Sequence, residues 1–171
     1  AVFDHSWHLL NGAEQQALMG LSYFRGGCTR RAAEQVVGVT LPLLASLIDK
    51  SLLARSEDGR FVLHELIRQF AAEHLQQDRV RLAQISQNHT TYYCDFLRRN
   101  RPRLESAQQY ASMSDIATEI ENLILAWEWI CTHHAFELVE PFILSLGYAL
   151  DNRGHHQQLM RLMDQGVRAF G

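Results

Sequence analysis

One histidine, His64, stands where a short apolar segment (residues 61–63) meets an amphipathic stretch (residues 65–71). An imidazole can donate a hydrogen bond to an anionic group such as a phosphate oxygen. It can equally bond to the backbone at the start of a helix. Loss of one charge-assisted hydrogen bond costs about 1.5–3 kcal/mol, enough to shift a two-state equilibrium about tenfold or more. Two interpretations of His64 therefore stand side by side: a ligand contact and a structural corner.

A cluster of arginines surrounds Pro102, and its members are Arg98, Arg99, Arg101 and Arg103. Such a cluster can bind phosphate or an acidic partner. A solvated connection between helices is the commoner use of a charge run. We predict a connection at this position.

Metal and nucleophile chemistry find little support in the remaining candidates. The histidine pairs at 133–134 and 155–156 are adjacent in sequence, and neighbours on a helix point about 100° apart, so neither pair chelates easily. Cys28, Cys94 and Cys131 have no local acid–base partner that would activate a thiol. Cys131 falls on an apolar stripe and is predicted to be core. We predict no catalytic and no metal site, and hence no enzyme activity in this chain.

The composition indicates a globular protein without a general affinity for polyanions. The chain has 171 residues, 47% of them hydrophobic, and a formal charge of -3, which gives no electrostatic pull toward nucleic acid or anionic membranes. Three widely spaced cysteines fit a reducing compartment better than a disulfide framework. No apolar run reaches the roughly 18 residues that span a bilayer, and the start is no signal peptide. We expect a cytoplasmic protein.

Residues 1–78 predict three helices, a β-hairpin and a fourth helix. Asn11 and Glu14 form a capping box for the first helix, and Thr29 and Thr40 cap the next two. The second helix ends at Gly38, and the third has an apolar face of Leu41, Leu44, Leu47 and Ile48. Segments 52–55 and 60–63 flank an Asp-Gly turn, which is a strong hairpin signal. A helix follows from about His64 to Leu75. Three helices and a hairpin are the order of a winged-helix domain.

Residues 79–171 predict antiparallel helices with short connections, as in an α-solenoid. One apolar stripe runs through Leu82, Ile85, His89, Tyr92, Tyr93, Phe96 and Leu97. A longer helix carries a stripe from Met113 to Cys131, and further helices cover about 136–152 and 156–170. Trp127, Tyr92 and Tyr93 are predicted core, whereas Trp129 lies off the stripe and is the better candidate for a partner contact. Such arrays usually need about three repeats, so the chain is expected to come from a longer protein.

Several segments together carry a family resemblance: residues 6–10, 14–15, 21–29, 32–34, 44–53, 64–71 and 121–123, with Ala126 and Trp127. They resemble the region after the nucleotide-binding domain in bacterial STAND ATPases of the NB-ARC type, which include LuxR-type and SARP-type transcriptional regulators. Segments 24–29 and 49–53 are the most specific. Leu63-His64-Glu65 resembles the Met-His-Asp corner that closes the winged-helix domain of that family, with leucine and glutamate as departures.

The resemblance implies a mainly α fold, with a winged-helix domain at 1–78 and truncated TPR-like helical repeats at 79–171. In the family the corner histidine touches the bound nucleotide diphosphate, so the resemblance assigns His64 to sensing the ADP phosphate in the intact protein. The intact protein would bind ATP or ADP with magnesium through a domain outside this chain. Because no Gly-x-x-x-x-Gly-Lys-Ser/Thr pattern occurs here, this segment alone is expected to hold no cofactor.

The implied function is regulatory and non-catalytic. The winged helix would clamp the nucleotide-binding domain of the same protein, and the repeats would bind an effector or a partner protein. Transcription activation is the expected output, with a cyclase or kinase output also open. The competing interpretation is a DNA-binding winged-helix regulator with a helical dimerisation domain. The third helix argues against it, because leucines dominate it and Asp49 sits beside Lys50, whereas base readout needs arginine, lysine or amides. We expect no direct nucleic-acid contact by this segment.

Overall fold

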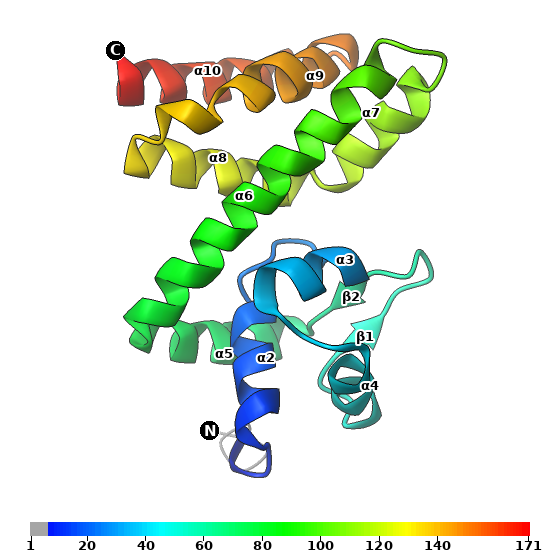
Figure 1. The fold of residues 1–171 in the computed structure, drawn as a ribbon, viewed down its shortest axis with the longest axis vertical. Helices are drawn as coiled ribbons and strands as arrows, with labels where there is room; N and C mark the ends of the chain where they lie inside the picture. Colours follow the sequence, from blue (N-terminus) through cyan, green and yellow to red (C-terminus); the bar gives the residue numbers. More distant parts are fainter. Residues whose placement is uncertain (1–6) are drawn as a thin grey trace. The chain divides into compact units, whose positions relative to one another are not determined.

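The computed structural model describes residues 7–171, so Ser6, which belongs to a matched segment, lies outside the described residues. This part of the chain is mainly helical and has one two-stranded antiparallel sheet (Figure 1). The predicted fold class is confirmed at that level. Contacts divide the chain into two compact units, one ending at His89 and one formed by Thr90–Gly171. The domain boundary predicted after residue 78 stays a prediction.

The first predicted helix is α2 (Gly12–Leu21), and it begins with the expected capping box. The Glu14 backbone N–H donates to Asn11 Oδ1 at 2.9 Å, and the Asn11 N–H donates to Glu14 Oε2 at 3.0 Å. Two N–H groups that a helix start leaves without an internal partner are thereby satisfied. α2 packs against α5 (Glu65–Gln77).

The second helix of unit 1 starts as α3 (Arg30–Ala32) and continues as a wider π-turn, η1 (Ala33–Val37). The Thr29 hydroxyl oxygen accepts from the Ala32 N–H at 3.2 Å, which confirms the predicted cap. Gly38 ends the helix in the left-handed region with φ 79°, a conformation that glycine adopts without steric cost. The widening in η1 was not predicted.

The third helix, α4 (Leu41–Asp49), begins after Thr40 and tolerates a proline in its first turn. The Thr40 side chain makes no capping hydrogen bond, so this cap is present by position only. Leu44 and Leu47 are fully buried, as predicted, but Leu41 is 46% exposed. Assigning Leu41 to the buried face was wrong, because that face is covered only from the second turn onward.

The hairpin consists of β1 (Ala54–Arg55) and β2 (Phe61–Val62), which pair antiparallel. It confirms the predicted hairpin, although both strands are shorter than predicted. Cys28 adds a third short segment: its N–H donates to Phe61 O at 3.0 Å and its carbonyl accepts from Phe61 N at 2.8 Å. The order of elements from α2 to α5 is therefore helix, bridge, helix, helix and hairpin, followed by a helix.

A buried carboxylate links the start of α2 to the end of α4. Glu14 is only 2% exposed, and Lys50 Nζ donates to both of its oxygens at 2.7 Å. The Ser46 hydroxyl donates to Oε1 at 2.8 Å. The hydrogen bond from Lys50, followed by that from Ser46, lowers the pKa of Glu14 against the effect of burial. Lys50 is the only lysine of the chain, and it serves this contact.

We predict that Glu14→Gln lowers the free energy of unfolding by about 1–3 kcal/mol, because it removes a buried acceptor of charge-assisted bonds. A lowered folded pKa gives stability that is complete above the unfolded pKa and is lost as the pH falls through the folded value. The difference between wild type and variant should therefore be full above the ordinary value of 4.5 and shrink at more acid pH. Urea denaturation at several pH values measures it.

Glu34→Gln is the matched control for this prediction. Glu34 accepts from Arg30 at 2.6 Å on an exposed helix face, where such i,i+4 pairs contribute about 0.3–0.5 kcal/mol. Equal losses for the two variants, or a Glu14→Gln loss that is independent of pH, would contradict the role given to the buried carboxylate.

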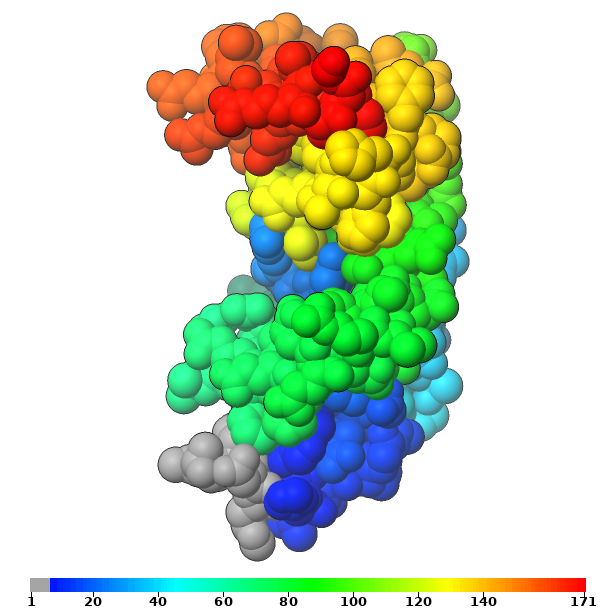
Figure 2. Space-filling model, turned by 90° about the vertical axis from the view of Figure 1, so that its left-hand side faces the viewer, coloured from blue at the N-terminus to red at the C-terminus, as the bar shows by residue number. Residues whose placement is uncertain are grey.

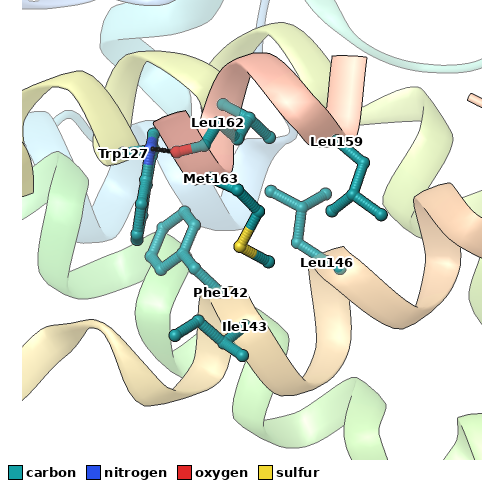
Figure 3. A pocket seen from close by; sticks show the side chains of 8 residues that line it. Trp127, Phe142, Ile143, Leu146, Leu159, Leu162 and Met163 are labelled. Carbon is teal, nitrogen blue, oxygen red and sulfur yellow. Dashed lines mark hydrogen bonds between the residues drawn. The ribbon is translucent and has the colours of Figure 1, made fainter. Parts of the chain in front are cut away.

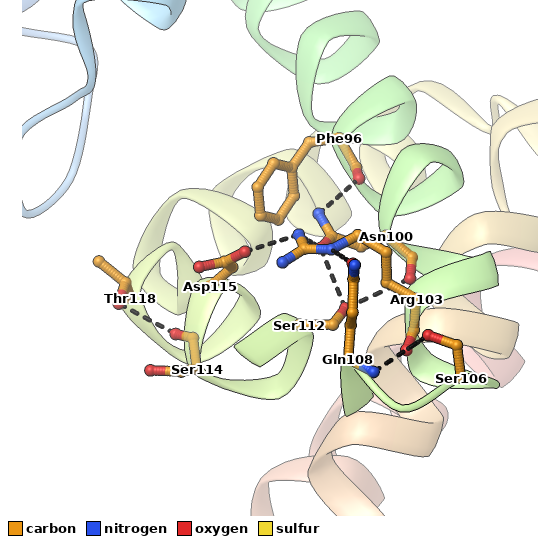
Figure 4. A network of polar contacts seen from close by, with 9 residues as sticks. All are labelled: Phe96, Asn100, Arg103, Ser106, Gln108, Ser112, Ser114, Asp115 and Thr118. Carbon is orange, nitrogen blue, oxygen red and sulfur yellow. Dashed lines mark hydrogen bonds and ion pairs between the residues drawn. The ribbon is translucent and has the colours of Figure 1, made fainter. Parts of the chain in front are cut away.

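The predicted connection around Pro102 is wrong, because this segment is part of a helix. α6 (Arg79–Leu104) stays helical through the proline, and its last turns are tied to α7 (Gln109–Thr118) by polar contacts (Figure 4). The buried Ser112 hydroxyl lies 3.0 Å from Asn100 Oδ1, and Arg103 Nη1 lies 2.7 Å from Asp115 Oδ2. These contacts support the helix end where sequence rules expect a break.

The arginines of this cluster have local partners. Arg98 pairs with Asp95 at 3.0 Å, Arg101 with Glu105 at 3.6 Å and Arg103 with Asp115 at 2.7 Å, and Arg99 lies 5.8 Å from the ring centre of Tyr92. Acids and an aromatic ring therefore balance the positive charge along this helix end. The alternative that the cluster binds phosphate or an acidic partner stays a prediction.

The long helix predicted from Met113 to Cys131 is wrong, because two helices cover it: α7 and α8 (Ile120–His133). They meet at Glu119, which is 5% exposed. Its carboxylate accepts from the Tyr93 hydroxyl at 2.9 Å and from Asn122 Nδ2 at 3.0 Å. The predicted helix is therefore interrupted at Glu119, whose buried carboxylate is held by these two partners.

The C-terminal part also differs from its prediction. The helix expected over 136–152 is divided into η2 (Phe136–Leu138), a π-turn η3 (Phe142–Gly147) and α9 (Tyr148–Asn152). The last helix, α10 (His156–Phe170), is confirmed. α10 packs against α8 and α9.

The predicted aromatic core of unit 2 is confirmed at Trp127, Tyr92 and Tyr93, which are all buried. Cys131 is only partly buried, so its assignment to the core was too strong. Trp129 is also partly buried and stacks on His133, with ring centres 4.1 Å apart. Its proposed partner contact stays a prediction.

No single helix within residues 7–171 combines the length and apolar composition that crossing a bilayer requires. The pair Arg30–Val37 and Leu41–Asp49 meets the criterion only when both helices are taken together, and it is bent by 110°.

Candidate functional site

His64 occupies the corner between β2 and α5. It is the N-cap residue of α5, with φ −58° and ψ 140°, and its side chain is exposed to solvent. Nδ1 accepts a hydrogen bond from the Leu66 N–H at a long 3.4 Å. The predicted position at a strand–helix junction is therefore confirmed, and the structural role, a local cap of α5, is present in the structure.

This cap has a consequence for the rest of the ring. When Nδ1 of a neutral imidazole accepts a hydrogen bond, Nε2 must carry the proton. Nε2–H lies on the other side of the ring from the cap and is a donor for a group outside α5. Capping and ligand contact are thus compatible roles of one side chain, because each uses a different nitrogen of His64.

The first turn of α5 places two charged groups beside His64. Glu65 accepts from Arg68 Nε and Nη2, both at 2.8 Å, and from Gln69 Nε2 at 2.8 Å. The hydrogen bond from Arg68, with a smaller one from Gln69, lowers the pKa of Glu65 to about 2. Glu65 is therefore ionised at neutral pH. Sequence reasoning assigned no role to this pair, although acid and base three residues apart at a helix start were a visible signal.

A hollow of about 160 Å³ lies next to this turn. Its lining includes Gly26, Gly27, Leu63, Glu65 and Arg68. Both glycines have positive φ, 72° and 78°, and a Cβ at Gly27 would lie 2.5 Å from Phe61 O. The loop can therefore approach β2 only because it has no side chain there. The result is a hollow with an apolar floor and a charged rim.

Other candidates do not form a site. Within the described residues, no group of three or more His, Cys, Asp or Glu side chains could hold a metal ion. His133 and His134 each bond through Nδ1 to a separate backbone carbonyl, at 2.9 Å. His156 lies 3.3 Å from Asp151. Burial raises the pKa of the Cys94 thiol to about 12, which disfavours a nucleophilic thiolate.

The exposed face of α4 lacks the groups that read DNA. Leu41, Pro42, Ala45 and Asp49 are exposed along it. Lys50 follows the helix, but its ammonium is bound to Glu14. Base readout and phosphate contacts require arginine, lysine or amide groups, and this face does not supply them.

Unit 2 has a separate apolar groove of about 320 Å³. Trp127, Phe136, Val139, Ile143, Met163 and Val167 contribute to its lining. Phe136 and Val167 are 71% and 70% exposed. Figure 3 shows the adjoining hollow, where the Trp127 indole N–H donates to Leu162 O at 3.0 Å and so fixes one wall to α10. Figure 2 shows α10 at the surface of unit 2.

Comparisons with protein-family models, with curated proteins and with solved structures found no match. The residues and their geometry therefore carry the functional argument.

We predict that His64→Asn keeps or raises the stability of the chain, by up to about 1 kcal/mol, because asparagine is a better N-cap than a histidine bonded at 3.4 Å. His64→Ala should lower stability by a few tenths of a kcal/mol through loss of the weak cap. Chemical denaturation of both variants measures the difference. A loss above about 2 kcal/mol in both would show that His64 has a larger structural role than its exposed position indicates.

Proposed function

We propose that this chain is a non-catalytic regulatory part of a STAND-type ATPase that regulates transcription. Residues 1–78 would be its winged-helix domain, and residues 79–171 would belong to TPR-like helical repeats. Two structural features support the first assignment: the order of α2, α3, α4 and the hairpin, and the bridge from Cys28 to β2. α8 and α10 pack against each other and run in the same direction, since Trp127 bonds to Leu162 O and His134 to Ala169 O, and the chain returns between them through α9; this arrangement is compatible with the second assignment.

The observation that carries the proposal is the state of His64. Its ring is exposed, its Nδ1 is used by the α5 cap, and its Nε2–H is left as a donor. In the family that this chain resembles, the equivalent corner histidine contacts the phosphate of ADP. We infer the same contact here, made to ADP that is held with magnesium by a nucleotide-binding domain of the intact protein.

The partner role of the repeats rests on the apolar groove of unit 2. Large exposed apolar surface is unusual for a soluble monomer and marks interaction sites. Effector or partner binding by the repeats would favour the open, ATP-bound state by its differential affinity for the two states. We place this cytoplasmic switch upstream of a transcriptional output. Direct DNA binding by unit 1 is not proposed, since the exposed face of α4 offers no suitable groups.

We predict that His64→Ala in the full-length protein speeds the release of bound ADP about tenfold or more and raises basal activity. Loss of one charge-assisted hydrogen bond to phosphate gives this magnitude. Displacement of a fluorescent ADP analogue, followed by stopped flow, measures the release rate. His64→Asn is the matched variant, since it keeps the cap but is too short to reach the same phosphate.

The two variants separate the interpretations. If ADP leaves both at the wild-type rate, His64 is a corner residue only. If His64→Ala releases ADP faster and His64→Asn does not, the cap and not the phosphate contact holds the nucleotide.

A further inference from the structure

Arg68 lies one helical turn after His64 on α5. Its backbone N–H donates to the His64 carbonyl at 2.9 Å, so the two residues are in i,i+4 positions on one side of the helix start. Its side chain is 35% exposed and helps to line the hollow beside Gly26 and Gly27. The two residues therefore lie one turn apart at the start of α5, with Arg68 lining the hollow and His64 exposed to solvent.

Glu65 holds the guanidinium by one edge only. Its two oxygens bond to Nε and Nη2 of Arg68, while Nη1 makes no hydrogen bond within the described residues. A guanidinium has five N–H donors. The edge formed by Nη1 and the second N–H of Nη2 is consequently available as a two-pronged donor, and the carboxylate fixes its orientation.

We infer that Arg68 is a second contact to the terminal phosphate of ADP and that Glu65 is its positioning residue. This inference rests on the proposed function. A planar guanidinium edge matches two phosphate oxygens better than any other side chain does. A guanidinium that a carboxylate already orients loses less rotamer freedom on binding. The glycine loop leaves room at the rim, since neither Gly26 nor Gly27 has a side chain to occupy it.

The test compares ADP with AMP on the full-length protein by calorimetry at fixed salt and magnesium. Arg68→Gln should weaken ADP binding about tenfold or more and leave AMP binding nearly unchanged, because AMP lacks the terminal phosphate. Arg68→Lys keeps the charge but lacks the two-pronged donor, so its ADP affinity should lie between those of wild type and Arg68→Gln. Glu65→Gln should weaken ADP less than Arg68→Gln does. Arg31→Gln changes an exposed arginine of α3 and should have no effect.

A purely structural role of Arg68 would lower ADP and AMP affinity by the same factor, and this result overturns the inference. Unchanged ADP affinity in Arg68→Gln overturns it as well. His64→Ala in the same series distinguishes a failure of the inference about Arg68 from a failure of the proposed function. If His64→Ala weakens ADP and Arg68→Gln does not, only the inference about Arg68 fails. If neither variant weakens ADP, the proposed function fails with it.

Discussion

The position of the hairpin–helix corner depends on the buried carboxylate of Glu14. It completes the cap of α2 and at the same time accepts from Ser46 and Lys50 at the end of α4. The chain leaves α4 directly into the hairpin, and the hairpin ends at His64. The ion pair between Glu14 and Lys50 therefore fixes the end of α4 from which the hairpin, and after it His64, follows. A buried charge is stable here because every oxygen of the carboxylate has a donor.

The Cys28 bridge adds the second constraint on the corner. Its two hydrogen bonds fasten the loop after α2 to β2, which makes the hairpin part of a larger unit. Isolated two-stranded hairpins are marginally stable, so the bridge and the packing of α5 on α2 keep this one in place. Rigid support matters for a residue proposed to contact phosphate, since hydrogen bonds weaken steeply with poor alignment.

Local signals predicted much of unit 1. The capping box at Asn11, the cap at Thr29, the stop at Gly38 and the Asp-Gly turn each follow from the conformation of a few neighbouring residues, and each is confirmed. Contacts between distant residues were not predictable in the same way. The second partner of Glu14, the Cys28 bridge, the break at Glu119 and the continuation of α6 past Pro102 all depend on partners far along the chain. The same distinction holds for the candidate site: the location of His64 follows from its local pattern, whereas the hollow requires the glycine loop to fold against β2.

The most direct test of the central claim is an experimental structure of the full-length protein with ADP and magnesium bound. We expect His64 Nε2 to lie about 2.7–3.2 Å from an oxygen of the terminal phosphate, the range of an N–H···O hydrogen bond, while Nδ1 keeps its bond to the Leu66 N–H. An ADP-bound structure in which the His64 ring faces solvent, with no phosphate oxygen in reach of Nε2, would contradict the account.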